Sequence, residues 1–315
     1  MVTLKPLVVP SFAKLNLGLE VLGSRLDGFH ELRTLFQTID LRDYIRITES
    51  SSGIEVTCSH PRVPCDGSNL AYKAAAELRR RGGVRRGVRI EIVKRIPVAA
   101  GLGGGSSNAA AVLTALDRLW DLGLGRGGLL PIARRLGADV PYFLTGGTAL
   151  GLARGDEVYP LHEQIHGHVV VIDPGQKVAT SRVFERVDAE LTPRENSLTI
   201  SRFVSSNLSG ADRFGILKNE LETAALVEAP DLAESARRMR IILMKKGAVL
   251  AQMTGSGSAF FGLFDEKASA SLARSALEAV GFRTFLARTL SLAQFRERCE
   301  RPLRGARGGA SGEAR

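Results

Sequence analysis

A glycine-rich segment between a predicted strand and a predicted helix has the composition of a phosphate-binding loop. Four of the five residues from Gly101 to Gly105 are glycines, which let backbone amides approach a ligand closely. Ser106, Ser107 and Asn108 follow at the expected helix start, where unpaired N–H groups and the positive end of the helix dipole face the loop. We therefore predict that a phosphate chain is bound by Pro97, Val98, Ala99, Ala100, Gly101, Leu102, Gly103, Gly104, Gly105, Ser106 and Ser107.

Two common phosphate-binding motifs do not match this segment. The P-loop requires a lysine directly after its glycines, and none follows here. The dinucleotide fingerprint requires glycine where Ser106 stands, and an acidic residue about 20 positions further on at a strand end. Asp117 and Asp121 fall instead within the predicted helix. A flexible glycine linker is the other interpretation, but such linkers do not usually lead into a helix with an apolar stripe.

A lysine and an aspartate far apart in the sequence have the chemistry for proton transfer. Lys14 is the only charged residue between Lys5 and Glu20, in a run with the apolar alternation of a strand. A buried ammonium requires an anionic partner, although a lysine reaching the surface is the alternative. Asp139, between apolar neighbours in a segment expected to turn, is a candidate general base. A helix N-cap or turn residue is the other interpretation of this aspartate.

The elements that position these residues alternate between strands and helices. Apolar periodicity in the first half predicts strands at 7–9, 14–22, 44–48, 54–57, 88–96 and 148–152, and helices at 70–81, 108–122 and 129–136. The second half predicts strands at 169–172, 260–264 and 282–287, and helices at 221–228, 232–246 and 268–280. This is an α+β pattern. We expect one domain over residues 1–160, a second over 161–300, and a disordered tail over 301–315.

Composition and charge narrow the class of partner. The 315 residues are 44% hydrophobic and 24% charged, as in ordinary globular proteins, and carry a formal charge of +10. Nucleic acid, acidic lipid or a phosphorylated small molecule all match this charge. Three cysteines without Cys-x-x-Cys spacing argue against a disulfide framework or a zinc site, and no apolar run is long enough to span a membrane. We expect a cytoplasmic protein without a targeting segment, in which His162, His166 and His168 belong to a polar surface loop rather than to a metal site.

Three segments together resemble the motifs of one enzyme family. Residues 97–107 read Pro-x-x-x-Gly-Leu-Gly-x-Gly-Ser-Ser, which is similar to the ATP-binding motif of the GHMP kinases. Residues 10–17 and 253–260 resemble the family's first and third motifs, and the three occur in the family's order. The resemblance implies an ATP-dependent small-molecule kinase with two domains, an N-terminal one like ribosomal protein S5 domain 2 and a ferredoxin-like C-terminal one. ATP and the acceptor would meet between them.

The resemblance also implies roles for individual residues. Lys14 would pair with Asp139, hold the acceptor hydroxyl and stabilise the transferring charge, while Asn16 would help to place the acceptor. Asn69 and Lys94 resemble contacts to the adenine side of the nucleotide. Either of them could instead be a helix N-cap or a surface residue. Mg²⁺ would be held mainly by phosphate oxygens near a loop serine hydroxyl, so no protein residue is predicted as a primary metal ligand.

Two further segments indicate which acceptor is used. Residues 25–32 and 137–143 resemble the family members whose acceptor is the 2-hydroxyl of 4-diphosphocytidyl-2-C-methyl-D-erythritol, in the non-mevalonate route to isoprenoid precursors. Phe29, which replaces the usual tyrosine, and His30 would recognise the cytosine, with Thr180 and Phe184 completing its pocket. Core packing is the alternative for Phe184. The rival functions are another GHMP kinase, such as a homoserine or mevalonate kinase, and a basic nucleic-acid binder. We expect a monomer or weak homodimer without nucleic-acid or membrane partners.

Overall fold

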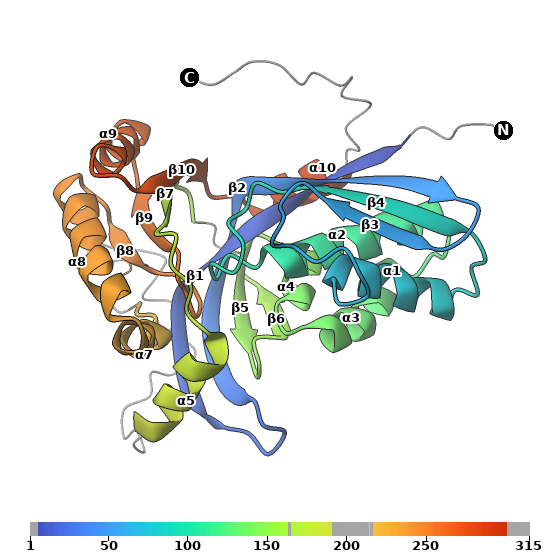
Figure 1. Cartoon of the computed structure of the whole chain (residues 1–315), viewed down its shortest axis with the longest axis horizontal. Helices are drawn as coiled ribbons and strands as arrows, with labels where there is room; N and C mark the ends of the chain where they lie inside the picture. Colours follow the sequence, from blue (N-terminus) through green and yellow to red (C-terminus); the bar gives the residue numbers. More distant parts are fainter. Residues whose placement is uncertain (1–5, 163–164, 191–213, 215–216, 301–315) are drawn as a thin grey trace.

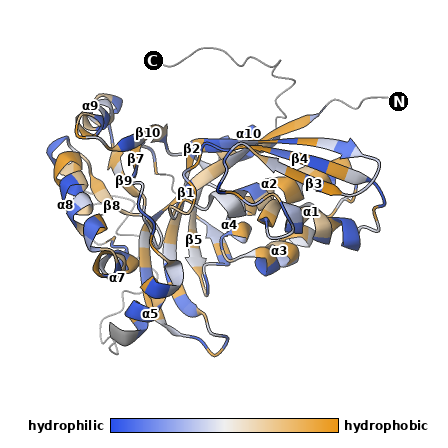
Figure 2. Cartoon of the chain, viewed as in Figure 1, coloured by the Kyte–Doolittle hydropathy of each residue, from blue (hydrophilic) through white to orange (hydrophobic). Residues whose placement is uncertain are grey.

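The computed structural model describes residues 6–162, 165–190, 214 and 217–300, which form two β-sheets placed side by side with helices packed against each (Figure 1). The predicted disordered tail, 301–315, lies outside the described residues. Figure 2 shows hydrophobic residues along the strands and on the inner sides of the helices, with hydrophilic residues toward the outside. The two-sheet α+β architecture agrees with the prediction.

The first sheet has six strands and is built around one long strand. The strands are β1 (Leu7–Ser24), β2 (His30–Ser50), β3 (Ile54–Cys58), β4 (Gly87–Val93), β5 (Thr148–Leu152) and β6 (Glu157–Pro160). β2 pairs along one edge with β1, and along the other with β4 and then β5. The order is β3-β4-β2-β5-β6, in which β3 and β4 are parallel and the remaining neighbours antiparallel.

Helices cover one face of this sheet and bury a core rich in alanine and leucine (Figure 1). They are α1 (Leu70–Arg81), α2 (Gly104–Leu119), α3 (Gly125–Leu136) and α4 (Val140–Thr145). The helix predicted over 70–81 is confirmed, because Asn69 caps it and Ala71, Ala74 and Leu78 form its buried stripe. The helix predicted from Asn108 begins four residues earlier, so its first turn lies within the glycine-rich segment.

The second sheet has four antiparallel strands in the order β10-β7-β9-β8. Its strands are β7 (His168–Asp173), β8 (Leu250–Met253), β9 (Phe260–Phe264) and β10 (Arg283–Arg288). The helices that follow in this half are α5 (Thr180–Glu190), α7 (Glu220–Glu228), α8 (Pro230–Lys245) and α9 (Lys267–Glu278). The last helix, α10 (Leu292–Glu300), packs against the first sheet instead. The chain passes from the first sheet to the second between β6 and β7. The domain boundary at residue 160 remains a prediction.

Contacts between the two halves converge on β1. Leu19 forms an isolated β-bridge with Asn219 at the start of α7. α10 packs against β1, and the ring centroids of Phe295 and Phe12 are 5.7 Å apart. One hydrophobic cluster contains Leu15 and Leu17 together with residues of β7 and β9. β1 is therefore packed from both sides, which explains why nearly every residue along its middle is buried.

The strand predicted over 88–96 ends early, at Val93. The next backbone N–H groups bond to side chains instead of a neighbouring strand. Lys94 N donates to Ser59 Oγ at 2.9 Å, and the amides of Arg95 and Ile96 donate to Asp43 Oδ1 at 2.7 and 2.9 Å. These side-chain acceptors turn the chain out of the sheet and into the glycine-rich segment.

Candidate active site

The lysine singled out in the sequence lies in the middle of β1 and is almost wholly buried. Lys14 is 4% exposed, and its backbone N–H donates to Leu102 O of the glycine-rich segment at 3.1 Å. Its ammonium nitrogen donates to Asn16 Oδ1 at 2.5 Å and lies 3.5 Å from Asp139 Oδ2. A buried ammonium needs such partners. The alternative of a lysine reaching the surface is therefore wrong.

Asp139 immediately precedes α4 and directs its carboxylate to Lys14. It occupies the N-cap position, but its side chain makes no capping hydrogen bond within the described structure. The carboxylate is 33% exposed, so it is accessible to a ligand. Tyr142 anchors α4 because its hydroxyl donates to Gly147 O at 2.8 Å and lies 2.7 Å from Thr38 Oγ1. Burial raises the pKa of this phenol above its ordinary value, which keeps it neutral.

Asn16 lies two residues beyond the lysine and is held by buried hydroxyl groups. Its backbone N–H donates to Thr254 Oγ1 at 2.9 Å, and its amide nitrogen donates to Thr34 Oγ1 at 2.8 Å. Thr34 in turn donates to Gly18 O at 2.7 Å. These contacts turn the amide oxygen of Asn16 toward Lys14. Segments 10–17 and 253–260, far apart in sequence, are thus adjacent in space, while the acceptor-placing role of Asn16 remains a prediction.

The glycine-rich segment brings backbone amides to the pair. At the start of α2, Ser107 N donates to Gly103 O at 2.9 Å, so the amides of the preceding residues face outward from the helix end. Gly101 has φ +77°, and a Cβ there would lie 2.1 Å from Thr254 O. Gly103 has φ +69°, with Lys14 and Phe143 against its Cα. Side chains are excluded at both positions.

A cavity of about 350 Å³ lies beside this segment. The predicted nucleotide-binding residues line it except for Ser107, which is buried and accepts a hydrogen bond from Ser11 Oγ at 2.7 Å. A direct ligand contact from the Ser107 hydroxyl is therefore not supported. The sequence prediction missed the lining residues Arg62, Val63, Pro64, Ser68 and Leu70, for which the Ser68-Asn69 cap was the sequence signal. Asn108, noted at the expected helix start but not predicted to bind the nucleotide, lines the cavity as well.

The two residues predicted for the adenine side have defined structural partners as well. Asn69 caps α1 by accepting from Ala71 N at 2.8 Å, and it also lines the cavity. Its position is therefore compatible with both a helix N-cap and a nucleotide contact. Lys94 also lines the cavity, but its side chain is only 4% exposed and donates to Asp43 Oδ2 at 2.5 Å. The surface-residue alternative for Lys94 is wrong. Adenine binding by either residue remains a prediction.

His30 and Phe184 from the predicted cytosine pocket are in contact. His30 begins β2 and its ring stacks on Phe184 of α5, with centroids 4.5 Å apart and planes 24° apart. Its Nε2 lies 2.8 Å from Asp188 Oδ1, one turn further along α5, and Ser24 Oγ donates to the same oxygen at 2.7 Å. These hydrogen bonds, that of Ser24 first, lower the pKa of Asp188. Phe184 also packs against the hydrophobic core that α7, α8 and α9 form with β7 and β9, as its core-packing alternative required.

Phe29 and Thr180 have other partners. Phe29 is 50% exposed, with the guanidinium carbon of Arg154 4.7 Å from its ring centroid. Thr180 Oγ1 lies 2.8 Å from Ser256 Oγ in the 253–260 segment. Phe29 and His30 therefore lie at the turn of the β1–β2 hairpin, while Thr180 and Phe184 lie on α5, next to the 253–260 segment. Their role in binding a base remains a prediction.

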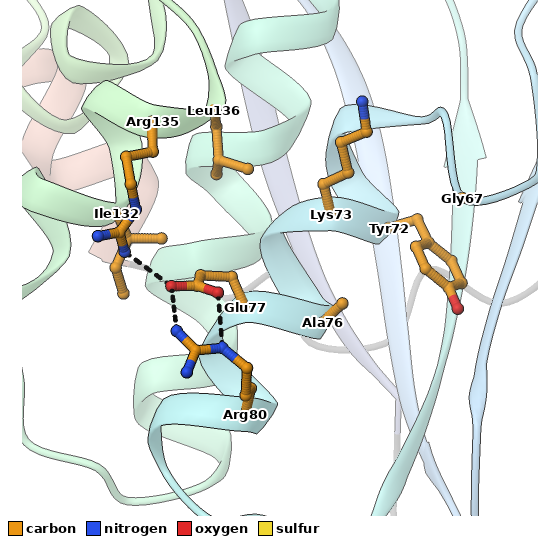
Figure 3. Close-up of a pocket in the computed structure, with 9 residues that line it drawn as sticks. All are labelled: Gly67, Tyr72, Lys73, Ala76, Glu77, Arg80, Ile132, Arg135 and Leu136. Atoms are coloured by element: carbon orange, nitrogen blue, oxygen red, sulfur yellow. Dashed lines mark hydrogen bonds and ion pairs between the residues drawn. The ribbon is translucent and has the colours of Figure 1, made fainter.

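A second cavity, of about 330 Å³, lies between α1 and α3 (Figure 3). At its edge Glu77 accepts from Arg80 at 2.9 Å and from Arg135 at 2.7 Å, and Arg81 lies 3.0 Å away. The hydrogen bond from Arg80, followed by those contacts, lowers the pKa of Glu77 to about 2. This cluster joins α1 to α3, and none of its residues lines the cavity beside the glycine-rich segment.

The described part of the chain contains neither a cluster of metal ligands nor a membrane-spanning helix. No three or more His, Cys, Asp or Glu side chains there gather as a metal site would require. This includes His162, His166 and His168. Among the same residues, no helix has both the length and the apolar character needed to cross a bilayer.

The paired sheets, with a buried lysine and aspartate beside a glycine-rich helix start, define the GHMP kinase class. The model of the GHMP kinase N-terminal domain matches residues 69–147, and that of the C-terminal domain matches residues 209–282. The crystal structure of a homoserine kinase from Cytophaga hutchinsonii shares this fold, with a TM-score of 0.64 and 19% identity over 90% of this chain and 95% of that chain.

Sequence identity narrows the assignment. A 4-diphosphocytidyl-2-C-methyl-D-erythritol kinase from Caldicellulosiruptor bescii is 40% identical over 263 residues, which are 82% of this chain and 90% of the relative. The crystal structure of a 4-(cytidine 5'-diphospho)-2C-methyl-D-erythritol kinase matches with a TM-score of 0.73 and 37% identity over 90% of this chain and 98% of that one. The chain belongs to the 4-diphosphocytidyl-2-C-methyl-D-erythritol kinase family.

Proposed function

We propose that this protein transfers the terminal phosphoryl group of ATP to the 2-hydroxyl of 4-diphosphocytidyl-2-C-methyl-D-erythritol, giving the 2-phosphate and ADP. The product belongs to the non-mevalonate route to isoprenoid precursors. The observation that carries the proposal is the contact of Lys14 with Asp139 beside the amides at the start of α2. The names of the relatives support the choice of acceptor.

The geometry supports a division of labour between the two charged residues. Asp139, accessible and directed away from the amides of α4, would accept the proton of the attacking hydroxyl. The ammonium of Lys14 would stabilise the negative charge on the transferring group, since it is buried and held by Asn16. The first-turn amides of α2 would bind the phosphate oxygens, and the helix dipole adds to their attraction. Positioning and charge stabilisation are what phosphoryl transfer chiefly requires.

The cavity also suits the Mg²⁺ that accompanies ATP. Mg²⁺ takes oxygen ligands and retains several waters, so a few protein oxygens beside a triphosphate are sufficient. Ser106 lines the cavity with a hydroxyl group, and the Asp139 carboxylate is accessible at the neighbouring pair. We propose that these two residues lie near the ion. When bound, the ion would neutralise part of the phosphate charge.

For the acceptor, we propose that Phe29, His30, Thr180 and Phe184 bind the cytosine ring. The contact of His30 with Phe184 supports this, because one flat aromatic surface is already formed at the turn end of the hairpin. Phe29 offers an exposed ring with a guanidinium beside it, which suits a base joined to a diphosphate. The replacement of tyrosine by Phe29 keeps the stacking surface and loses a hydroxyl.

The proposal is tested by measuring ADP release from the purified protein with three acceptors. We expect turnover with the diphosphocytidyl substrate, and none with homoserine or mevalonate above the acceptor-free rate. Removing divalent cations with a chelator should abolish turnover, and adding Mg²⁺ should restore it. Preferred use of homoserine or mevalonate would refute the acceptor assignment. Absence of acceptor-dependent ADP release would refute the function.

We propose further that the protein acts in the cytoplasm as a monomer or weak homodimer without a nucleic-acid partner. A site formed by residues of one chain supports an active monomer. The formal charge of +10 suits a protein that binds ATP and a diphosphate ester, so it does not require a nucleic-acid partner. Light scattering at two protein concentrations tests the oligomeric state. A titration with duplex DNA at physiological salt tests the absence of nucleic-acid binding, which tight binding would contradict.

A further inference from the structure

Asp43 on β2 is a fully buried carboxylate to which the mechanism above gives no role. Its side chain has no exposed area. Oδ1 accepts from the amides of Arg95 and Ile96, and Oδ2 accepts from Lys94 Nζ at 2.5 Å and Asn108 Nδ2 at 2.9 Å. A buried carboxylate is tolerated only when it is paired and hydrogen-bonded in this manner. Its donors come from both ends of the glycine-rich segment.

The two backbone contacts fix where the glycine-rich segment begins. The amides of Arg95 and Ile96 directly precede Pro97, the first residue of the segment. Those amides have left the β4 ladder, so Asp43 supplies the acceptors that the sheet no longer provides. Without the carboxylate oxygen, the buried amide of Ile96 and the partly buried amide of Arg95 would lose their acceptor. The path of the chain into the cavity therefore depends on this side chain.

The two side-chain contacts fix the other end of the segment. Lys94 Nζ lies 2.6 Å from the point that a Cβ on Gly104 would occupy, against the first residue of α2. An ammonium beside the positive end of a helix is unfavourable alone, and the charge of Asp43 offsets that repulsion. Asn108 also donates to Ser11 Oγ at 2.8 Å, which ties the first turns of α2 to β1. Lys94 and Asn108 both line the cavity.

We propose that Asp43 is a positioning residue for the nucleotide. It acts through Lys94, Asn108 and the 95–96 backbone to hold the glycine-rich segment in the arrangement that receives the phosphates. It touches neither ATP nor the acceptor. The inference rests on the proposed function, because it assumes that a nucleotide binds in this cavity.

The test compares Asp43→Asn with a matched control, Asp117→Asn. Asp117 is also a buried carboxylate, and it accepts two backbone N–H groups at 3.0 Å, those of Leu124 and Gly125. It lies near the far end of α2 and does not line the cavity. The measurements are KM for ATP, KM for the acceptor, kcat, and the melting temperature of each variant. Binding of a non-hydrolysable ATP analogue is measured in parallel.

For Asp43→Asn we expect kcat/KM for ATP to fall by about 10²-fold, as for a misplaced binding group, with KM for the acceptor within about twofold. Asp117→Asn should leave both KM values unchanged at a similar melting temperature. If KM for ATP changes equally in both variants, or in neither, the inference is overturned. Should Asp43→Asn not fold, Asp43→Asn with Lys94→Met removes both buried charges, which proteins often tolerate. Unchanged ATP-analogue affinity in that variant overturns the inference. If the unsubstituted protein binds no ATP, the proposed function fails and the inference with it.

Discussion

Replacing Asp139 by asparagine should separate catalysis from stability. The substitution keeps the shape of the side chain and removes its charge and basicity. Loss of a general base typically lowers kcat by about 10²- to 10⁴-fold, equivalent to about 3 to 5 kcal/mol of barrier. Because the Asp139 side chain makes no capping hydrogen bond within the described structure, α4 should start as before.

The structure limits the cost in stability. At the 3.5 Å separation from Lys14, Coulomb's law gives about 5 kcal/mol at an effective dielectric constant of about 20, and about 1 kcal/mol in water. The carboxylate is 33% exposed and Lys14 keeps Asn16 as a partner. We therefore expect a loss near the lower figure, or a fall in melting temperature of about 2 to 4 °C for a chain of this size.

The assay combines steady-state ADP release with a thermal unfolding curve on the same preparation. Asp121→Asn, the same change at an exposed turn residue with φ +52°, serves as the control and should alter neither measurement. If Asp139→Asn kept kcat within about tenfold of the unsubstituted protein, the base assignment would be refuted. A fall in melting temperature above about 10 °C would instead refute the stability argument.

Three further predictions concern the loop, the α1–α3 ion pairs and the thiols. Gly101→Ala should weaken ATP binding by at least about tenfold, because its backbone is in the left-handed region and a Cβ there would meet Thr254 O. Gly127→Ala in α3, where a Cβ would have nothing within 4 Å, should leave ATP binding unchanged; a nucleotide titration checks both. Since the folded-state pKa of Glu77 is lowered to about 2 from an ordinary 4.5, its contribution should be present above pH 4.5 and decline as the pH falls toward 2. Glu77→Gln should thus lower the free energy of unfolding by about 1 kcal/mol at pH 7 and by less at pH 3, as denaturant curves would show; an equal loss at both would contradict this. Burial raises the pKa of the Cys299 thiol to about 12, so at pH 8 an alkylating reagent should modify the exposed Cys65 and reach Cys299 only after unfolding, as peptide mass mapping would reveal.

Local signals allowed the sequence to predict much of the fold. The helix over 70–81 was predictable because its cap, its alanine stripe and its end lie within a dozen residues of one another. The strand over 148–152 was predictable because Gly146-Gly147 precedes it and the charged residues Arg154 and Asp156 follow it. The start of α2 was not, because glycine is normally a poor helix former and only the packed loop makes Gly104 and Gly105 helical.

The long first hairpin was only partly predictable. The first strand was expected as two runs, 7–9 and 14–22, but β1 is continuous from Leu7 to Ser24. β2 was expected only over 44–48 but runs from His30 to Ser50. Alternation of polar and apolar residues indicates a strand with one buried face. β1 is buried on both faces over most of its length, and register shifts interrupt its pairing with β2. Both features remove the period of two from the sequence.

The candidate site divides in the same way. Lys14 and the glycine-rich segment could be identified locally, from a charge in an apolar run and from composition. The pairing of Lys14 with Asp139 was expected only from the resemblance to the GHMP kinases. Asp43 could not be identified, since its partners lie 51 to 65 residues away and an aspartate on a strand carries no local sign of burial. Contacts of this kind depend on the packing of distant segments, which a single sequence does not reveal.

The position of β1 explains why a charged pair can be maintained inside this protein. Val9 belongs to the core under α1 and α2, Leu15 and Leu17 to the cluster between the sheets, and Val21 to the core beside α7 and α8. Lys14 lies where the first two cores meet, so its neighbours are held from both sides. Burying its ammonium costs stability, and Asn16 and Asp139 offset that cost only while the two halves remain packed. Integrity of the site and packing of the two sheets are therefore the same structural requirement.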